Sequence, residues 1–180
     1  MSGFAKPHEN VLQLGLHEGM KVADFGAGTG HYAFTAAAAV GKEGRVYAID
    51  VQKDVVAHLK HLARERHISN LEVVWGDVEK RIGTSLRDHS IDAVILSNIL
   101  FQIRHTELLT EEVKRILKPS AKLLVIDWAG AYGGMGPAAE LVFSEQRAEA
   151  LFMEAGFHKV KSVRAGPHHY GIVFTAPDFV

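Results

Sequence analysis

Hydrophobic residues along this chain follow two alternating periods. Five short runs of β-branched and aliphatic residues have the length and composition of strands that are buried on both faces of a sheet. These runs are KVADF from Lys21, RVYAID from Arg45, LEVVW from Leu71, IDAVILS from Ile91 and KLLVID from Lys122. Five such runs in succession predict a mainly parallel sheet.

Between these runs the apolar residues recur at the spacing of a helix. Helices are predicted from His31 (HYAFTAAAAV), from Lys53 (KDVVAHLKHLARER) and from Glu107 (ELLTEEVKRIL), the last ending before Pro119. The segment 76–90 shows no helical pattern. Strands that alternate with helices require right-handed crossovers, which place helices on both faces of an open, doubly wound α/β sheet.

The pattern changes after Asp127. A helix is predicted from about Glu145, capped by Ser144 and ended by Gly156. Two strand-like runs follow, joined by a turn at residues 165–167. They form a closing hairpin, so the final strand is predicted to run antiparallel to the others.

Composition and charge exclude several classes of protein. The 180 residues are 47% hydrophobic and 23% charged, as in a single globular domain, and 20 Lys and Arg oppose 21 Asp and Glu. This balance gives no basic field for binding nucleic acid. The lack of cysteine excludes disulfides and thiolate chemistry and fits a cytoplasmic protein. No signal segment or long apolar run is present, so no integral membrane contact is expected, while the oligomeric state stays open.

A glycine-rich turn joins the first strand to the following helix. Gly26, Gly28 and Gly30 leave backbone N–H groups free to approach a ligand, as in nucleotide-binding loops. A dinucleotide fingerprint would place its third glycine where His31 stands. In addition, Asp24 at the strand end suits a ligand with an ammonium group and repels a pyrophosphate. The loop therefore favours a nucleoside ligand other than a nicotinamide dinucleotide.

Acidic residues also end the next two strands. Asp50 follows Gly26 by 24 residues, where a carboxylate can accept hydrogen bonds from both hydroxyls of a ribose. After the third strand come Gly76, Asp77 and Val78, an acid and an apolar residue suited to the amino group and the ring of adenine. Three strand ends are thus predicted to bind an amino acid group, a sugar and a base.

With these motifs in place, the chain resembles the class I S-adenosylmethionine-dependent methyltransferases, particularly the type-11 group that includes ubiquinone and menaquinone methyltransferases. The resemblance rests on VADFGAGTGHY, VYAIDV, GDVE, IDAVILSNILFQI and LKPSAKLLVIDW and covers about residues 10–175. It implies a Rossmann-like seven-stranded sheet in the order 3-2-1-4-5-7-6, with strand 7 antiparallel. It also implies S-adenosylmethionine as the methyl donor, bound at the carboxyl ends of the first strands, with S-adenosylhomocysteine as the product.

The resemblance assigns the donor site residue by residue. The residues expected to bind S-adenosylmethionine are Asp24, Phe25, Gly26, Ala27, Gly28, Gly30, Asp50, Val51, Gln52, Gly76, Asp77, Val78, Ser97 and Asn98. It assigns no catalytic base. The sequence SNILFQI lacks the Pro-Pro-aromatic motif of adenine-amine methylases, which disfavours a nucleobase nitrogen as acceptor, and the lack of cysteine excludes arsenic methylation.

The acceptor is expected on the same edge of the sheet, because an antiparallel last strand begins where the parallel strands end. That placement would bring together Phe101, Gln102, Asp127, Trp128, Pro167, His168, His169 and Tyr170. A base is needed only if the acceptor must lose a proton, and a neutral histidine is the suitable type. His168 and His169 are the predicted catalytic pair, followed by His31 and His8. No metal site is expected.

The sequence therefore predicts one methyltransferase domain over residues 1–180. Residues 1–20 form a leading helical segment and candidate lid with apolar Val11, Leu12 and Leu14, residues 21–127 the cofactor-binding core, and residues 128–180 the acceptor side. The expected reaction is in-line methyl transfer to a small-molecule or lipid-like acceptor. Two alternatives stay open, a catalytically silent S-adenosylmethionine-binding module and an NAD-dependent oxidoreductase.

Overall fold

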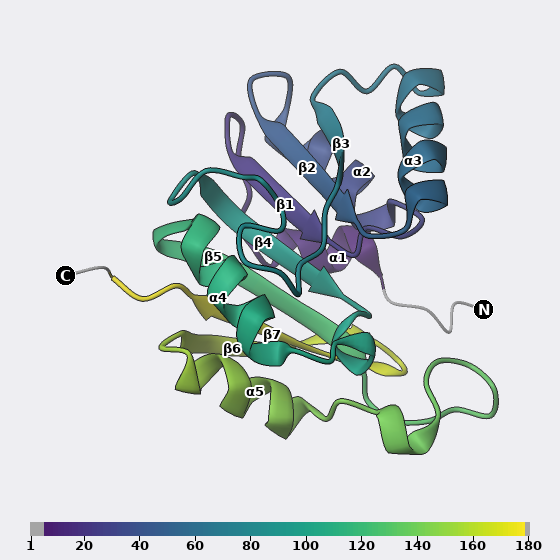
Figure 1. Ribbon diagram of the computed structural model, residues 1–180, viewed down its shortest axis with the longest axis vertical. Helices are drawn as coiled ribbons and strands as arrows, with labels where there is room; N and C mark the ends of the chain where they lie inside the picture. Colours follow the sequence, from purple (N-terminus) through teal and green to yellow (C-terminus); the bar gives the residue numbers. More distant parts are fainter. Residues whose placement is uncertain (1–5, 179–180) are drawn as a thin grey trace.

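The computed structural model describes residues 6–178, and its centre is a seven-stranded sheet. The strands are β1 (Lys21–Phe25), β2 (Arg45–Asp50), β3 (Leu71–Trp75), β4 (Ile91–Ser97), β5 (Leu117–Trp128), β6 (His158–Gly166) and β7 (His169–Thr175). Their order is β3-β2-β1-β4-β5-β7-β6, which can be followed from top to bottom in Figure 1. Only the pairings of β7 are antiparallel. The predicted fold class, strand order and strand direction are confirmed.

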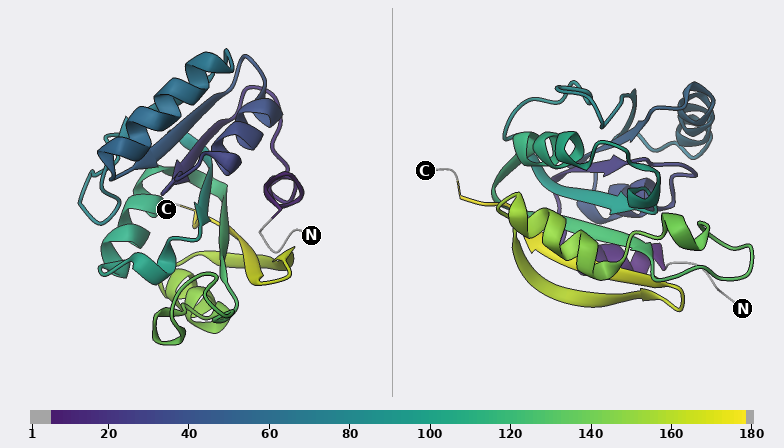
Figure 2. Two further views of the ribbon diagram at one scale, coloured as in Figure 1. Left: turned by 90° about the vertical axis from the view of Figure 1, so that its right-hand side faces the viewer. Right: turned by 60° about the horizontal axis from the view of Figure 1, so that its bottom comes forward.

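Helices cover both faces of the sheet. They are α1 (Pro7–Leu12), α2 (His31–Val40), α3 (Lys53–Glu65), α4 (Thr106–Ile116) and α5 (Glu145–Glu154). One apolar core joins α4 and α5 to the sheet and the other joins α1, α2 and α3 to the opposite face. In Figure 1, α4 and α5 lie in front of the sheet, and Figure 2 shows the segment 129–143 projecting from its edge.

Local sequence signals set several element boundaries where they were expected. Ser144 caps α5 by accepting a hydrogen bond from the N–H of Arg147 at 3.3 Å, and Gly156 ends the helix with a φ of +93°. The strand predicted from Lys122 starts earlier, at Leu117, because α4 passes directly into β5.

The leading segment forms a shorter helix than its apolar residues suggested. Val11 and Leu14 are buried, but α1 ends at Leu12 and the side chain of Leu12 is 63% exposed. The apolar contact of the leading segment with the core is therefore made by Val11 and Leu14. Residues 1–5 of the candidate lid lie outside the described part of the chain, and none of the described helices is long and apolar enough to cross a membrane.

Candidate functional site

A cavity of about 850 Å³ opens at the carboxyl ends of β1, β2, β3 and β4. All fourteen residues predicted to bind the donor line it, except Phe25 and Gly30. The fold thus gathers residues that are up to 74 positions apart in the sequence, from Asp24 to Asn98. The position agrees with the rule that open parallel sheets bind ligands outside their carboxyl edge.

The two exceptions have roles in the scaffold. Phe25 is fully buried in the core under α4 and α5, so its side chain does not face the cavity. Gly30 has a φ of +80°, and an added Cβ would lie 2.6 Å from Leu59 Cδ2 of α3. A glycine is needed there because the chain turns into α2 against the wall of α3.

Two interactions shape the glycine loop. A Cβ at Gly26 would lie 2.3 Å from Ile99 Cγ2, so the loop backbone passes close to the segment after β4. The Asp50 carboxylate accepts hydrogen bonds from the N–H groups of Gly28 at 3.1 Å and Gln52 at 2.9 Å. Asp50 is thus tied to the loop, and its two oxygens still have lone pairs that can accept further hydrogen bonds from a ligand.

Asp24 is the most perturbed acid of the cavity. It is 1% exposed, and its Oδ2 atom has no hydrogen-bond partner. The pKa of Asp24 is raised to about 8, mainly by burial, with a further contribution from the nearby charge of Asp50 and an opposing one from the N–H of Ala33. Asp24 lines the cavity, and a buried carboxyl with an unpaired oxygen is suited to a positively charged ligand group. The Asp24 carboxyl therefore fits the ammonium group of S-adenosylmethionine.

The charges of the cavity favour the same ligand. Asp24, Asp50, Asp77 and Glu79 line it, and no Lys or Arg does so in the described chain. The exposed Lys80 lies beside the cavity, with Nζ 3.3 Å from Asp77 Oδ2. A cavity with this excess of carboxylates attracts a sulfonium or an ammonium group and repels a pyrophosphate.

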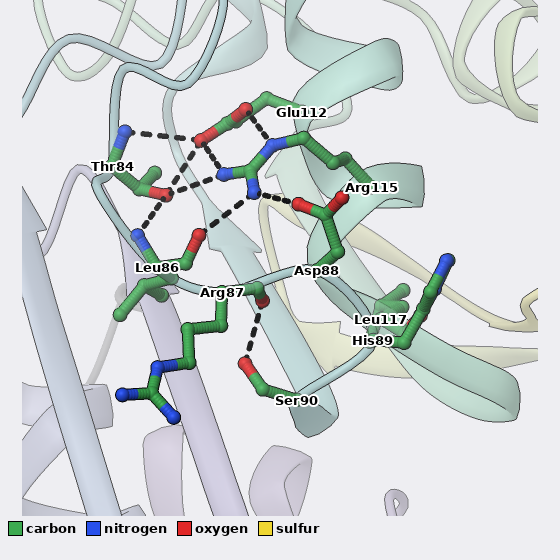
Figure 3. Close-up of polar contacts among 9 residues, drawn as sticks. All are labelled: Thr84, Leu86, Arg87, Asp88, His89, Ser90, Glu112, Arg115 and Leu117. Atoms are coloured by element: carbon green, nitrogen blue, oxygen red, sulfur yellow. Dashed lines mark hydrogen bonds and ion pairs between the residues drawn. The ribbon is translucent and has the colours of Figure 1, made fainter.

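The cavity wall after β3 is held by a buried ion pair (Figure 3). As predicted, the segment 76–90 contains no helix, so its backbone needs other partners. Glu112 of α4 accepts hydrogen bonds from the N–H and hydroxyl of Thr84, and Arg115 donates to Glu112 and to the carbonyl of Leu86. The carbonyl of Gly83, next to Thr84, accepts from the N–H of Asp77. This network connects α4 to the part of the wall predicted to contact adenine.

The predicted catalytic histidines do not line the cavity. His169 is 5% exposed and stacks on Trp128, with ring centroids 4.3 Å apart, while the ring of His168 lies 4.2 Å from that of Tyr132. Burial lowers the pKa of His169. Asp127 is buried and accepts hydrogen bonds from the N–H groups of Leu100 and Trp128, so it holds the loop after β4.

Of the eight residues expected to line the acceptor side together, Gln102 reaches the donor cavity, and the other seven do not. The register of β5 and β7 places His169 beside Trp128, as predicted, but neither histidine lines the donor cavity, and their role as a base stays a prediction. The sequence did not predict the course of the segment 129–143. A Cβ at Gly136 would lie 2.5 Å from the Trp128 ring, so this segment passes directly over Trp128.

The two secondary candidates for the base, His31 and His8, differ in their position relative to the cavity. His31 lines the cavity at the start of α2, whereas His8 is exposed on α1. The sequence interpretation missed Pro7, Tyr32 and Glu79, which also line the cavity. The available signal for Tyr32 was its position in the first helical turn after the glycine loop, where side chains face the strand ends.

Comparison with known proteins agrees with the site. The family described as Methyltransferase domain matches residues 16–164. A curated relative, the ubiquinone/menaquinone biosynthesis C-methyltransferase UbiE of Laribacter hongkongensis, is 29% identical over 137 residues, which make up 74% of this chain and 53% of the relative. The chain thus spans about half the length of the curated relatives it matches.

Solved structures extend the comparison to nearly the whole chain. A crystal structure of a SAM-dependent methyltransferase from Aquifex aeolicus is 30% identical and has a TM-score of 0.88, covering 96% of this chain and 90% of that chain. The [4+2]-cyclase SpnF shares the fold with a TM-score of 0.81 at 18% identity, over 96% of this chain and 81% of its own. The chain belongs to the Methyltransferase domain family, as a class I S-adenosylmethionine-dependent methyltransferase of the UbiE-like type.

Proposed function

We propose that this protein transfers a methyl group from S-adenosylmethionine to a small-molecule or lipid-like acceptor by in-line displacement. The observation that carries the proposal is the acidic cavity at the strand ends, whose lining includes the buried Asp24 carboxyl with its unpaired Oδ2 atom. When bound, the donor supplies a methyl carbon that is already activated by the sulfonium. The protein's share of the rate is then alignment and exclusion of water.

Different residues of the cavity bind different parts of the donor. Asp24 takes the ammonium group of the amino acid tail, and Asp50 accepts hydrogen bonds from the ribose hydroxyls. Asp77 and Val78, on the wall held by the Glu112 network, take the adenine edge and ring. Asp50 Oδ2 already accepts a hydrogen bond from the N–H of Gly28, so occupation of the sugar site and the shape of the glycine loop depend on the same side chain.

The acceptor side of the cavity is partly apolar. Pro7, Ile99 and Ile103 line it together with Gln102, which supports an acceptor with a hydrophobic part. The names of the curated relatives place them in ubiquinone and menaquinone biosynthesis, which supports the same class of acceptor. The absence of Lys and Arg from the described lining gives no support for a nucleic acid acceptor. A cytoplasmic location stays a prediction from composition.

His168 and His169 stay candidates for the base. Neither histidine lines the donor cavity, and the Trp128 ring, which packs against His169, is covered by the segment 129–143. A neutral His169 suits proton abstraction, because its lowered pKa keeps the imidazole unprotonated at neutral pH. For acceptors that need no deprotonation, neither histidine is required.

A silent S-adenosylmethionine-binding module is the second candidate function. It is favoured by one observation, the position of both predicted bases outside the cavity. The cyclase SpnF further illustrates that this fold also occurs in proteins named for other reactions. An NAD-dependent oxidoreductase is opposed by the carboxylates beside the glycine loop.

Two measurements test the proposal. Titration calorimetry should show binding of S-adenosylhomocysteine and no binding of NAD. Turnover is then measured with methyl-labelled donor and a panel of phenolic, quinol and amine acceptors. Absence of binding to S-adenosylhomocysteine would refute the donor assignment, whereas binding without label transfer to any acceptor would favour the silent module.

A further inference from the structure

The helix α1 contacts the donor cavity, although it precedes the region matched by the family, which begins at residue 16. Pro7 lines the cavity, and Asn10 on the same helix is 1% exposed. Asn10 Nδ2 donates one hydrogen bond to the hydroxyl of Tyr32 at 2.9 Å and another to the carbonyl of Ala165 at 3.0 Å. Both hydrogens of this amide are therefore used, which fixes its orientation.

The hydroxyl of Tyr32 is oriented by this contact. Tyr32 is 8% exposed and lines the cavity from the first turn of α2. Since its oxygen accepts the hydrogen bond from Asn10, its own proton is available to another group. Burial raises the pKa of Tyr32, hydrogen bonds with Asn10 and Ser97 oppose the rise, and the nearby charge of Asp24 adds to it. The hydroxyl thus keeps its proton at neutral pH.

The amino acid tail of the donor carries two opposite charges, and only one of them has an evident partner. Asp24 suits the ammonium group, but the tail carboxylate meets a cavity lined by four acids and by no Lys or Arg in the described chain. A carboxylate in such surroundings needs neutral hydrogen-bond donors. Tyr32 is a buried side chain with such a donor beside Asp24.

We propose that the Tyr32 hydroxyl, oriented by Asn10, donates a hydrogen bond to the tail carboxylate of the methyl donor, so that α1 completes the amino acid end of the donor site. This inference rests on the proposed function. Tyr32 is then a binding residue and Asn10 a positioning residue that acts through it.

The same amide connects the donor site to the acceptor side. The carbonyl of Ala165 in β6 accepts hydrogen bonds from Asn10 Nδ2 and from the N–H of Lys6 at 3.1 Å. The side chains of Val11 and Leu14 are buried and pack this part of the chain against the core. The Asn10 amide therefore both attaches α1 to the β6–β7 hairpin and orients the hydroxyl of Tyr32.

Two ligands that differ only at the tail test the inference. S-adenosylhomocysteine carries the amino acid tail, whereas 5′-methylthioadenosine keeps the adenosine and the sulfur but lacks the tail. Calorimetry with the full chain should show that Tyr32→Phe weakens S-adenosylhomocysteine binding by roughly 10- to 100-fold, the cost of losing a hydrogen bond to a charged group. Binding of 5′-methylthioadenosine should be unchanged within about twofold, which also reports that the variant is folded.

A second variant and a control complete the experiment. Asn10→Leu keeps the Tyr32 hydroxyl but removes its orientation, and should cause the same selective loss at a smaller size, roughly 3- to 10-fold. Tyr47→Phe, on β2 and away from the cavity lining, should leave both affinities unchanged. If Tyr32→Phe and Asn10→Leu leave S-adenosylhomocysteine binding intact, or weaken both ligands equally, the inference is overturned. If the unaltered protein binds neither ligand, the proposed function itself fails.

Discussion

The buried carboxyl of Asp24 makes donor binding depend on pH in a way that can be calculated. In the free protein the pKa of Asp24 is raised to about 8 by burial, so the carboxyl is mostly protonated at neutral pH. An ammonium group at its free Oδ2 stabilises the ionised form. Ligand binding should therefore release a proton, and the protein competent to bind is the fraction with Asp24 ionised.

The size of the effect follows from that fraction. With a pKa of about 8, about one hundredth of the free protein has an ionised Asp24 at pH 6, about one tenth at pH 7 and about half at pH 8. The apparent affinity for S-adenosylhomocysteine should thus rise about tenfold from pH 6 to 7 and about fivefold from pH 7 to 8. At pH 7, binding should release about 0.9 protons per site.

Calorimetry in two buffers of different ionisation enthalpy measures both quantities. Asp24→Asn should remove the pH dependence and the proton release, since the amide cannot ionise. Asp127→Asn is the matched control, because Asp127 is also buried, with a pKa raised to about 6, but does not line the cavity. A wild-type affinity constant within twofold between pH 6 and pH 8 would refute the reasoning.

The raised pKa of Asp24 also predicts how the free energy of unfolding of the ligand-free protein changes with pH. The pKa of Asp24 in the folded protein lies above its ordinary value of 3.8. The folded state therefore binds more protons than the unfolded state between these two values. The free energy of unfolding should fall with rising pH between about pH 4 and pH 8, by at most about 1.4 kcal/mol per pH unit from this group. Asp24→Asn should flatten the upper part of this dependence, as measured by urea unfolding.

Three further substitutions address the remaining parts of the site. Asp50→Ala should cost about 2–4 kcal/mol of affinity for S-adenosylhomocysteine, roughly 30- to 1000-fold by calorimetry, and an affinity near that of the wild type would contradict the ribose assignment. Glu112→Leu should lower the free energy of unfolding in urea by about 1–3 kcal/mol because the buried N–H and hydroxyl of Thr84 lose their acceptor while Arg115 keeps its ion pair with Asp88, whereas exposed Glu111→Gln should change it by less than about 0.5 kcal/mol. Replacing His168 and His169 together should reduce turnover and leave donor binding intact if either is the base; equal turnover would remove both from that role.

The strands, their directions and the position of the cavity were predictable because their signals are local, whereas the strand order was implied by the resemblance to class I methyltransferases. Runs such as KVADF and IDAVILS specify buried strands by composition alone, and a glycine turn followed by HYAFTAAAAV specifies a strand-to-helix connection. Right-handed crossovers then place the strand ends on one edge, which is why Asp24, Asp50 and Asp77 meet in one cavity. Their binding roles stay predictions.

The acceptor side was less predictable because it depends on contacts between distant segments. The register of β5 and β7 pairs Trp128 with His169, and the segment 129–143 then covers the Trp128 ring. No local pattern indicates how a glycine-rich segment of this length folds back, since glycine permits many backbone conformations.

The sequence by itself determined the layers, the strand directions and the acids at the strand ends, because hydrophobic periodicity and turn chemistry act over a few residues. Only the tertiary structure decided which polar atoms find partners. Asn10 meets Ala165 across 155 positions, and Asp24 is left with an unpaired oxygen, because burial and hydrogen bonding depend on the complete set of neighbours. The protonation state of the cavity, and with it the predicted dependence of donor binding on pH, is for this reason a property of the fold.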